Sequence, residues 1–180
     1  MNAFKKTLND STGADVYSTR LKWEAYLTGL EATLLCEEKD MDGVSNLLKK
    51  IEDMIQNSTT GYAFCKEYLE KTDLMLKAWL SREQEDYVQS ARTLRQLEKI
   101  LLDKGAYLSP SDQSSLAHIY RLMGENYMRL NKPACARSYF EKAIKRISDI
   151  QNRTRDDNLE MILCLYGLGE SRSLTGVFVN

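Results

Sequence analysis

The chain has 180 residues, 43% of them hydrophobic and 28% charged, which suits a helix-rich domain with a sizeable core. Its 25 basic and 26 acidic residues give a net charge of −1, so there is no overall electrostatic attraction for nucleic acid or anionic membranes. Residues 1–15, predicted to be a flexible N-terminus, lack the apolar core of a signal peptide, and no run of 18 apolar residues follows. These features predict a cytoplasmic protein, with the nucleus left open.

Apolar residues recur with helical spacing along almost the whole chain. The first stripe runs through Trp23, Leu27, Leu30 and Leu34, and similar stripes follow it. No segment shows sustained alternation of β-branched and polar residues, so no strand is expected. The sequence therefore predicts an all-α fold of seven helices, at about 16–38, 42–57, 61–82, 85–104, 110–130, 133–151 and 156–173.

The segments between these stripes contain helix-capping residues. Aspartates in KDMDG (39–43) can cap the second helix, and NSTTG (57–61) separates the second helix from the third. SPSD (109–112) supplies a serine N-cap, a proline at the first helical position and an early acid for the helix dipole. We expect Asn131-Lys132-Pro133 to begin the sixth helix in the same way, and RTRDDN (153–158) to begin the seventh.

An internal repeat of 46 residues becomes visible when the even-numbered helices are aligned. Val44, Ser90 and Ala136 are each 46 residues apart. The same shift aligns Leu48, Leu94 and Phe140; Ile51, Leu97 and Ala143; Ile55, Leu101 and Ile147; and the small residues Ala32, Ala78 and Gly124 of the odd-numbered helices. We interpret 16–180 as a single domain of three helix-turn-helix units, at about 16–58, 61–104 and 110–151, followed by an unpaired helix at about 156–173.

The third unit carries the most specific pattern, YRLMGENYMRLNKPACARSYFEKAIKRI from Tyr120 to Ile147. Small residues at Gly124 and Ala136 permit close approach of two helices, and the rings of Tyr120 and Phe140 fill the adjacent holes. This spacing resembles the tetratricopeptide repeat (TPR) family, whose pattern is W-x2-L-G-x2-Y followed by A-x3-F.

The resemblance covers 117–150 well and is degenerate over 25–58 and 71–104. Tyr120 replaces the family's tryptophan, Ser148 stands where the family often has proline, and the period exceeds the usual 34 residues. The chain therefore resembles a long-helix TPR variant, an α-solenoid of three repeats plus a seventh helix. A HEAT-like solenoid, with a period of about 40–47 residues, is the structural alternative.

In the TPR family, the first helices of the pairs line a concave groove that binds protein partners. The resemblance thus implies a non-catalytic interaction scaffold or adaptor, alone or as a subunit of a larger complex, holding a partner peptide or helix. Leu122 and Glu125 stand where a clamp for the acidic C-termini of chaperones would need asparagine or a cation, so that kind of clamp is not expected. The groove positions transferred to this chain are Met75, Leu76, Trp79, Arg82, His118, Arg121, Glu125 and Arg129.

No pattern for catalysis, cofactor binding or metal binding was found. His118 is the only histidine, and no nucleotide-binding or metalloprotease motif is present. Gly167 and Gly169 are interpreted as sites of close helix packing rather than half of a nucleotide fingerprint. The cysteines Cys36, Cys65, Cys135 and Cys164 are scattered and are expected to be buried free thiols. Two alternatives stay open: a helical regulator that senses a ligand or binds RNA, and an enzyme with a composite site around His118.

The seventh helix is unusually apolar, with no polar residue from Met161 to Tyr166. A terminal solenoid helix normally has a polar outer face, so an all-round apolar one needs a second covering surface. We expect a homo-oligomer or hetero-complex to form here, through an association surface of Met161, Leu165, Leu168 and Phe178.

Overall fold

In the computed structural model, which describes residues 22–56, 63–103 and 108–176, every regular element is an α-helix. This confirms the predicted all-helical fold for that part of the chain. The predicted flexible N-terminus (1–15), the linker 57–61 and Phe178 lie outside the described residues. The chain divides into two compact units, Met1–Lys77 and Ala78–Asn180, and the boundary falls inside α3.

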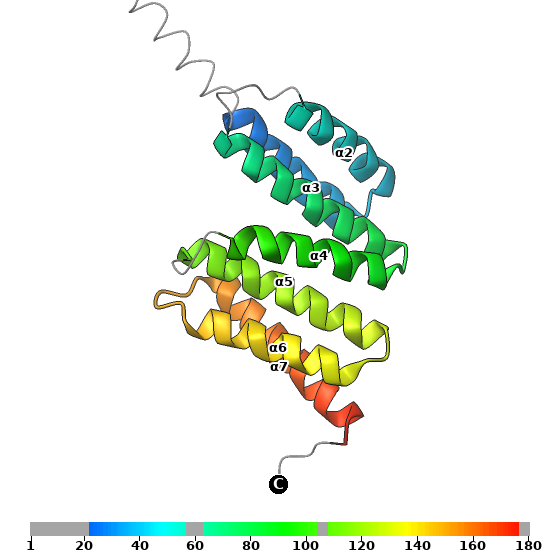
Figure 1. Ribbon diagram of the computed structural model, residues 1–180, viewed down its shortest axis with the longest axis vertical. Coiled ribbons are helices and arrows are strands. Elements are labelled where there is room, and N and C mark those ends of the chain that lie inside the picture. The colour runs from blue at the N-terminus through cyan, green and yellow to red at the C-terminus, as the bar shows by residue number, and fades with distance from the viewer. Residues whose placement is uncertain (1–21, 57–62, 104–107, 177–180) are drawn as a thin grey trace, which may run out of the picture. The chain divides into compact units, whose positions relative to one another are not determined.

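The helices follow one another with short connections (Figure 1). Wherever both ends of a helix are described, the predicted ends agree with the observed ones to within three residues. A helix covers 22–38, and after it come α2 (Met41–Gln56), α3 (Ala63–Glu83), α4 (Tyr87–Leu102), α5 (Pro110–Arg129), α6 (Pro133–Ser148) and α7 (Arg155–Leu174).

The 46-residue period is present in the helix bounds. The helices α2, α4 and α6 each contain 16 residues, and they begin at Met41, Tyr87 and Pro133, 46 residues apart. Most of their aligned positions are buried in all three helices, including Val44, Ser90, Ala136, Ile51, Leu97 and Ala143, whereas Ile55 is half-buried where Leu101 and Ile147 are buried. The polar exception, Ser90, is satisfied because its hydroxyl accepts a hydrogen bond of 2.9 Å from Asn126 Nδ2 on α5. The repeat is therefore a property of the three-dimensional structure as well as of the sequence.

The turns before α2, α4 and α6 share a backbone geometry that the sequence did not reveal. Lys39, Glu85 and Asn131, again 46 residues apart, have φ values of 57°, 60° and 55°. In each turn this left-handed residue and the next one donate backbone hydrogen bonds to two carbonyls of the last turn of the preceding helix, the pairing of a Schellman C-cap. Asn131 therefore ends α5 rather than capping α6. Our prediction of an N-cap there was wrong, since the N-cap is Lys132 and its side chain makes no capping hydrogen bond.

The other predicted caps are present. Asp40 Oδ1 accepts a 2.8 Å hydrogen bond from the Gly43 amide at the start of α2. Ser109 caps α5 with Pro110 next to it. Thr154 and Asp157 form a reciprocal capping box at the start of α7, and Asp157 also accepts a 2.6 Å hydrogen bond from Ser114 on α5. The start of α7 is thus attached to α5.

In the first unit, three helices pack around small residues. The backbone at Gly29 of the 22–38 helix lies so close to Tyr68 of α3 that an added Cβ would fall 2.0 Å from the hydroxyl oxygen. Between α2 and α3, Lys77 Nζ lies 2.8 Å from Glu52 Oε1. The buried apolar residues of this unit include Ala25, Ala32, Val44, Leu47, Ile51 and Leu69.

In the second unit, Phe140 of α6 packs between glycines of two other helices. A Cβ added at Gly124 on α5 would lie 2.7 Å from the ring, and one added at Gly167 on α7 would lie 2.4 Å from it. The predicted close packing is confirmed at Gly124 and Gly167, whereas Gly169 has open space around it. Figure 1 shows the result, with α7 crossing behind α6 and contacting both α5 and α6.

Candidate functional site

A chain of ion pairs runs along the side of α5 that was predicted to line the groove. Arg82 Nη2 lies 2.7 Å from Glu125 Oε2, and the other oxygen of Glu125 pairs with Arg121. Arg121 Nε in turn donates to Glu160 Oε1 on α7 at 2.6 Å, and Glu160 Oε2 lies 3.4 Å from His118 Nδ1. Two of the predicted groove cations, Arg82 and Arg121, are therefore neutralised by carboxylates of the same unit.

The electrostatics of this chain favour its charged form. Burial of Glu160 acts to raise its pKa, but the hydrogen bonds and charges of His118 and Arg121 outweigh burial and hold that pKa below its ordinary value. The Arg121 side chain is only 12% exposed. Because α7 covers Arg121 in this way, the guanidinium has little access to a carboxylate from a partner.

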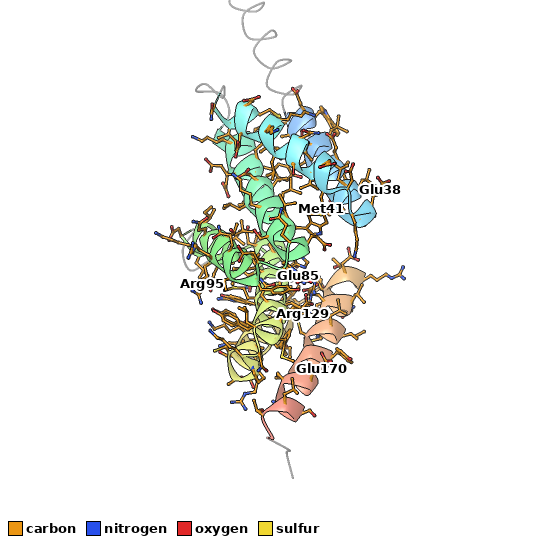
Figure 2. All side chains as sticks on the ribbon, turned by 90° about the vertical axis from the view of Figure 1, so that its right-hand side faces the viewer. Glu38, Met41, Glu85, Arg95, Arg129 and Glu170 are labelled. Carbon is orange, nitrogen blue, oxygen red and sulfur yellow. The ribbon has the colours of Figure 1, made fainter. Side chains whose placement is uncertain are left out.

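Beyond the ion pairs, α5 and α7 border a cavity of about 540 Å³. Figure 2 labels Arg129 on α5 and Glu170 on α7, which both line it. Arg129 is exposed, and neither it nor Glu170 has an ion-pair partner among the described residues. The remaining lining residues are Arg82, Glu125, Met128, Phe140, Leu163, Tyr166 and Gly167. The cavity thus combines an apolar wall with one cation open to solvent.

The structure brings together only part of the predicted groove. Arg82, Glu125 and Arg129 line the cavity, while His118 and Arg121 lie beside it under Glu160. Leu76 is 3% exposed, so its expected place on a groove wall is corrected to the core. Met75 and Trp79 are half-buried and do not line the cavity; Met75 and Leu76 belong to the first unit, whereas Trp79 belongs to the second.

Sequence reasoning missed the contribution of α7 to this cavity. Leu163, Tyr166 and Glu170 form one of its walls, but none of the predicted groove residues was placed on the seventh helix, which was assigned an association surface instead. Gly167 was the available signal, because a glycine inside an apolar helix indicates close approach of another helix. If α6 had been recognised as the helix that packs against Gly167, the side of α7 that faces the cavity could have been predicted.

The predicted association surface is divided by the structure. Leu165 is exposed and Met161 is half-buried, but Leu168 is 8% exposed and packs with Ala136 and Phe140. Leu168 therefore belongs to the core, since α7 turns this side toward α6. The large apolar side chains that α7 leaves open are Leu159, Ile162, Leu163, Leu165, Tyr166 and Leu174.

Over the described residues, no group of three or more His, Cys, Asp or Glu side chains is placed to hold a metal ion. Within the same ranges, no helix combines the length and apolar character needed to cross a membrane. Cys65 and Cys164 are buried thiols as expected, whereas Cys36 is half-buried and Cys135 is exposed, contrary to expectation. Burial raises the pKa of the Cys164 thiol to about 12, which leaves it protonated and a poor nucleophile. No protein-family model, curated protein or solved structure matches the chain.

Proposed function

We propose that the chain is a non-catalytic protein-interaction scaffold of the TPR-like solenoid kind, which holds a partner peptide or helix in the cavity between α5 and α7. The observation that carries the proposal is the combination, in one cavity of about 540 Å³, of an apolar wall with Arg129, a cation that no carboxylate of the described residues neutralises. Such a site binds by burying apolar side chains and orienting one polar group. The compartment proposed is the cytoplasm, with the nucleus left open.

The chemistry of the cavity specifies the kind of partner segment. The apolar wall of the cavity is formed by Met128, Leu163 and Tyr166. Leu163 and Tyr166 are 40% and 67% exposed, so a partner segment can contact them. Arg129 is the group able to pair with a partner carboxylate, because Arg82 and Arg121 already have Glu125 and Glu160. The partner segment is therefore expected to carry a large apolar side chain next to an acidic one.

The alternatives are less well supported by the same residues. The cavity lining contains two arginines and two glutamates, Arg82 and Arg129 against Glu125 and Glu170, and this balance gives no basic path for RNA. His118 contacts Glu160 and Arg121, which occupy its ring nitrogen Nδ1, and Cys164 of α7 is a buried thiol rather than an activated nucleophile. A protein-binding function requires neither a basic path nor an activated nucleophile.

A peptide-display selection on the immobilised chain tests the proposal. The selected peptides should carry an acid adjacent to a bulky apolar residue, and Arg129→Glu should weaken their binding at least tenfold. Arg92→Glu, which reverses an exposed arginine on α4 outside the cavity, is the matched control and should change affinity less than twofold. Replacing the peptide's acid with lysine should restore binding to Arg129→Glu. Selection of no peptide, or equal binding by both variants, would overturn the proposal.

A further inference from the structure

Two helices in different units leave apolar stripes uncovered by the described residues. On the helix 22–38, the large side chains of Trp23, Leu27, Leu30 and Leu34 are between 58% and 65% exposed. On α7, those of Leu159, Ile162 and Tyr166 are between 55% and 67% exposed. Each set lies on one face of its helix, because the members are three or four positions apart. Contiguous apolar faces of this kind mark association surfaces.

The two stripes have different counterparts among the other helices. The steps of four, three and four residues from Trp23 to Leu34 repeat those of Val44, Leu48, Ile51 and Ile55 on α2, of which the first three are buried and Ile55 is half-buried. Two members of the α7 stripe, Ile162 and Tyr166, correspond 46 residues earlier to Leu116 and Tyr120, which are buried on α5, whereas Leu159 corresponds to the half-buried Gln113. In the spacing of its apolar residues the 22–38 stripe therefore matches that of α2, although this helix stands in the period where α3 and α5 stand, and most of the α7 stripe corresponds to positions that are buried on α5.

The charges at the ends of the stripes fix a direction. Arg155 and Glu170 flank the α7 stripe, 15 positions apart on the same face, and Lys22 and Glu37 flank the other stripe, also 15 positions apart. All four side chains are exposed, and none has an ion-pair partner within the described ranges. Antiparallel docking brings Glu37 to Arg155 and Lys22 to Glu170, and it centres Leu30 on Ile162. Parallel docking would bring like charges together at both ends.

We propose that the helix 22–38 of one copy of the chain docks antiparallel on α7 of a second copy. The occupant is a second copy because the chain itself carries the helix whose apolar spacing and end charges fit the α7 stripe. This contact shares Tyr166 and Glu170 with the cavity of the proposed function, but Leu159 and Ile162 do not line that cavity and Arg129 is not on the α7 stripe, so Ile162→Glu and Arg129→Glu test the two proposals separately. The contact joins two different surfaces, so each added copy leaves one of each kind free.

The experiment measures the mass of the full chain by sedimentation over a range of concentrations. The unmodified chain should form species that grow beyond a dimer as concentration rises. Leu30→Glu and Ile162→Glu should each lose all species heavier than one chain, because each places a charge in one stripe. A mixture of the two variants should form a 1:1 dimer and nothing larger, since each variant keeps the surface that the other lacks. Val88→Glu, at an exposed apolar residue on α4 outside both stripes, is the control and should associate normally.

Three outcomes would overturn the proposal. The first is a monomeric unmodified chain at every concentration. The second is a dimer that Ile162→Glu abolishes and Leu30→Glu leaves intact, which indicates a two-fold contact between α7 helices. The third is a mixture of the two variants that stays monomeric. Circular dichroism of each variant checks that the helices are retained, as expected for substitutions at residues more than half exposed. Arg155→Glu should weaken association at least fivefold, and Glu37→Arg on the other copy should restore it.

Discussion

The helices α5 and α7 occupy equivalent positions in the 46-residue period, yet residues that are buried on α5 are exposed at the equivalent positions of α7. Leu116, Ala117, Ile119 and Tyr120 of α5 are buried, whereas the residues 46 positions later are exposed, namely Ile162, Leu163, Leu165 and Tyr166. Conversely, Gly167 and Leu168 of α7 are buried, and their α5 equivalents, Arg121 and Leu122, are only half-buried.

The comparison teaches that sequence pattern and burial are separate properties. Both helices carry an apolar stripe that can pack against the next helix in the chain. Among the described residues, α5 is followed by such a helix, α6, whereas no helix follows α7. In place of such a neighbour, α7 is held by its other side, through Gly167 against Phe140 and Glu160 against Arg121.

The strongest test truncates equivalent residues of the two stripes. Leu116→Ala on α5 removes a fully buried side chain and should lower the free energy of unfolding by about 2–5 kcal/mol. Ile162→Ala, 46 residues later, should change it by no more than about 0.5 kcal/mol, because that side chain is 63% exposed. Urea denaturation, in a Leu30→Glu background that prevents self-association, measures both. A cost for Ile162→Ala as large as that for Leu116→Ala would mean that α7 is covered within a single chain.

The two glycines of α7 give a matched pair within one helix. Gly167→Ala places a Cβ against the Phe140 ring, which cannot retreat because Gly124 lies close to it as well, and should destabilise the fold by about 1–3 kcal/mol. Gly169→Ala meets no atom within 4 Å and should stabilise by about 0.5–1 kcal/mol through helix propensity. Thermal unfolding of both variants checks the signs, and equal effects would contradict the packing of α7 on α6.

The ion pair between α5 and α7 predicts a pH dependence. The pKa of Glu160 is lowered in the folded state, so its contribution is fully present above the ordinary carboxyl pKa of 4.5 and is lost as pH falls through the folded value. Glu160→Gln should therefore cost about 1–2 kcal/mol at pH 7. The difference between the two proteins should shrink below pH 4.5. Denaturation curves at pH 7, 5 and 3.5 follow it, and a difference independent of pH would show that the carboxylate charge does not matter.

The smallest predicted effect concerns the shared turns. Glu85→Gly removes the strain of a bulky residue at φ 60° and should stabilise by about 0.5–1 kcal/mol. Asn131→Gly should gain less, because asparagine tolerates the left-handed region better than glutamate does. Thermal unfolding distinguishes the two, and destabilisation by Glu85→Gly would show that its side chain makes a contact that outweighs the strain.

Much of the fold could be predicted because it depends on local residues. Helix ends followed from caps such as Ser109 and Thr154, and the period followed from small residues, Ala32, Ala78 and Gly124, that permit close packing. The left-handed turns could not be predicted in this way, since Lys39, Glu85 and Asn131 have little in common as residue types. Their conformation is imposed by backbone hydrogen bonds at the helix ends.

The candidate site was predictable only in part for a similar reason. Arg82, Glu125 and Arg129 were selected from α3 and α5 alone, and all three line the cavity. Which groups neutralise Arg121, and which wall faces Arg129, depends on the rotation of α7 about its axis. That rotation is set by Gly167 and Glu160, whose partners are distant in sequence.

The equivalence of the three turns has a consequence for how a gene encoding this chain can change in length. A deletion of codons 86–131 would join Glu85 to Lys132, and a duplication of the same segment would place Asp86 after Asn131. In both cases the junction falls where the chain is already left-handed and where the Schellman pair of hydrogen bonds is made by backbone groups. The reading frame, the turn geometry and the helix that follows are all preserved. Unequal recombination within such a gene can therefore add or remove two helices while the junction keeps an existing type of turn.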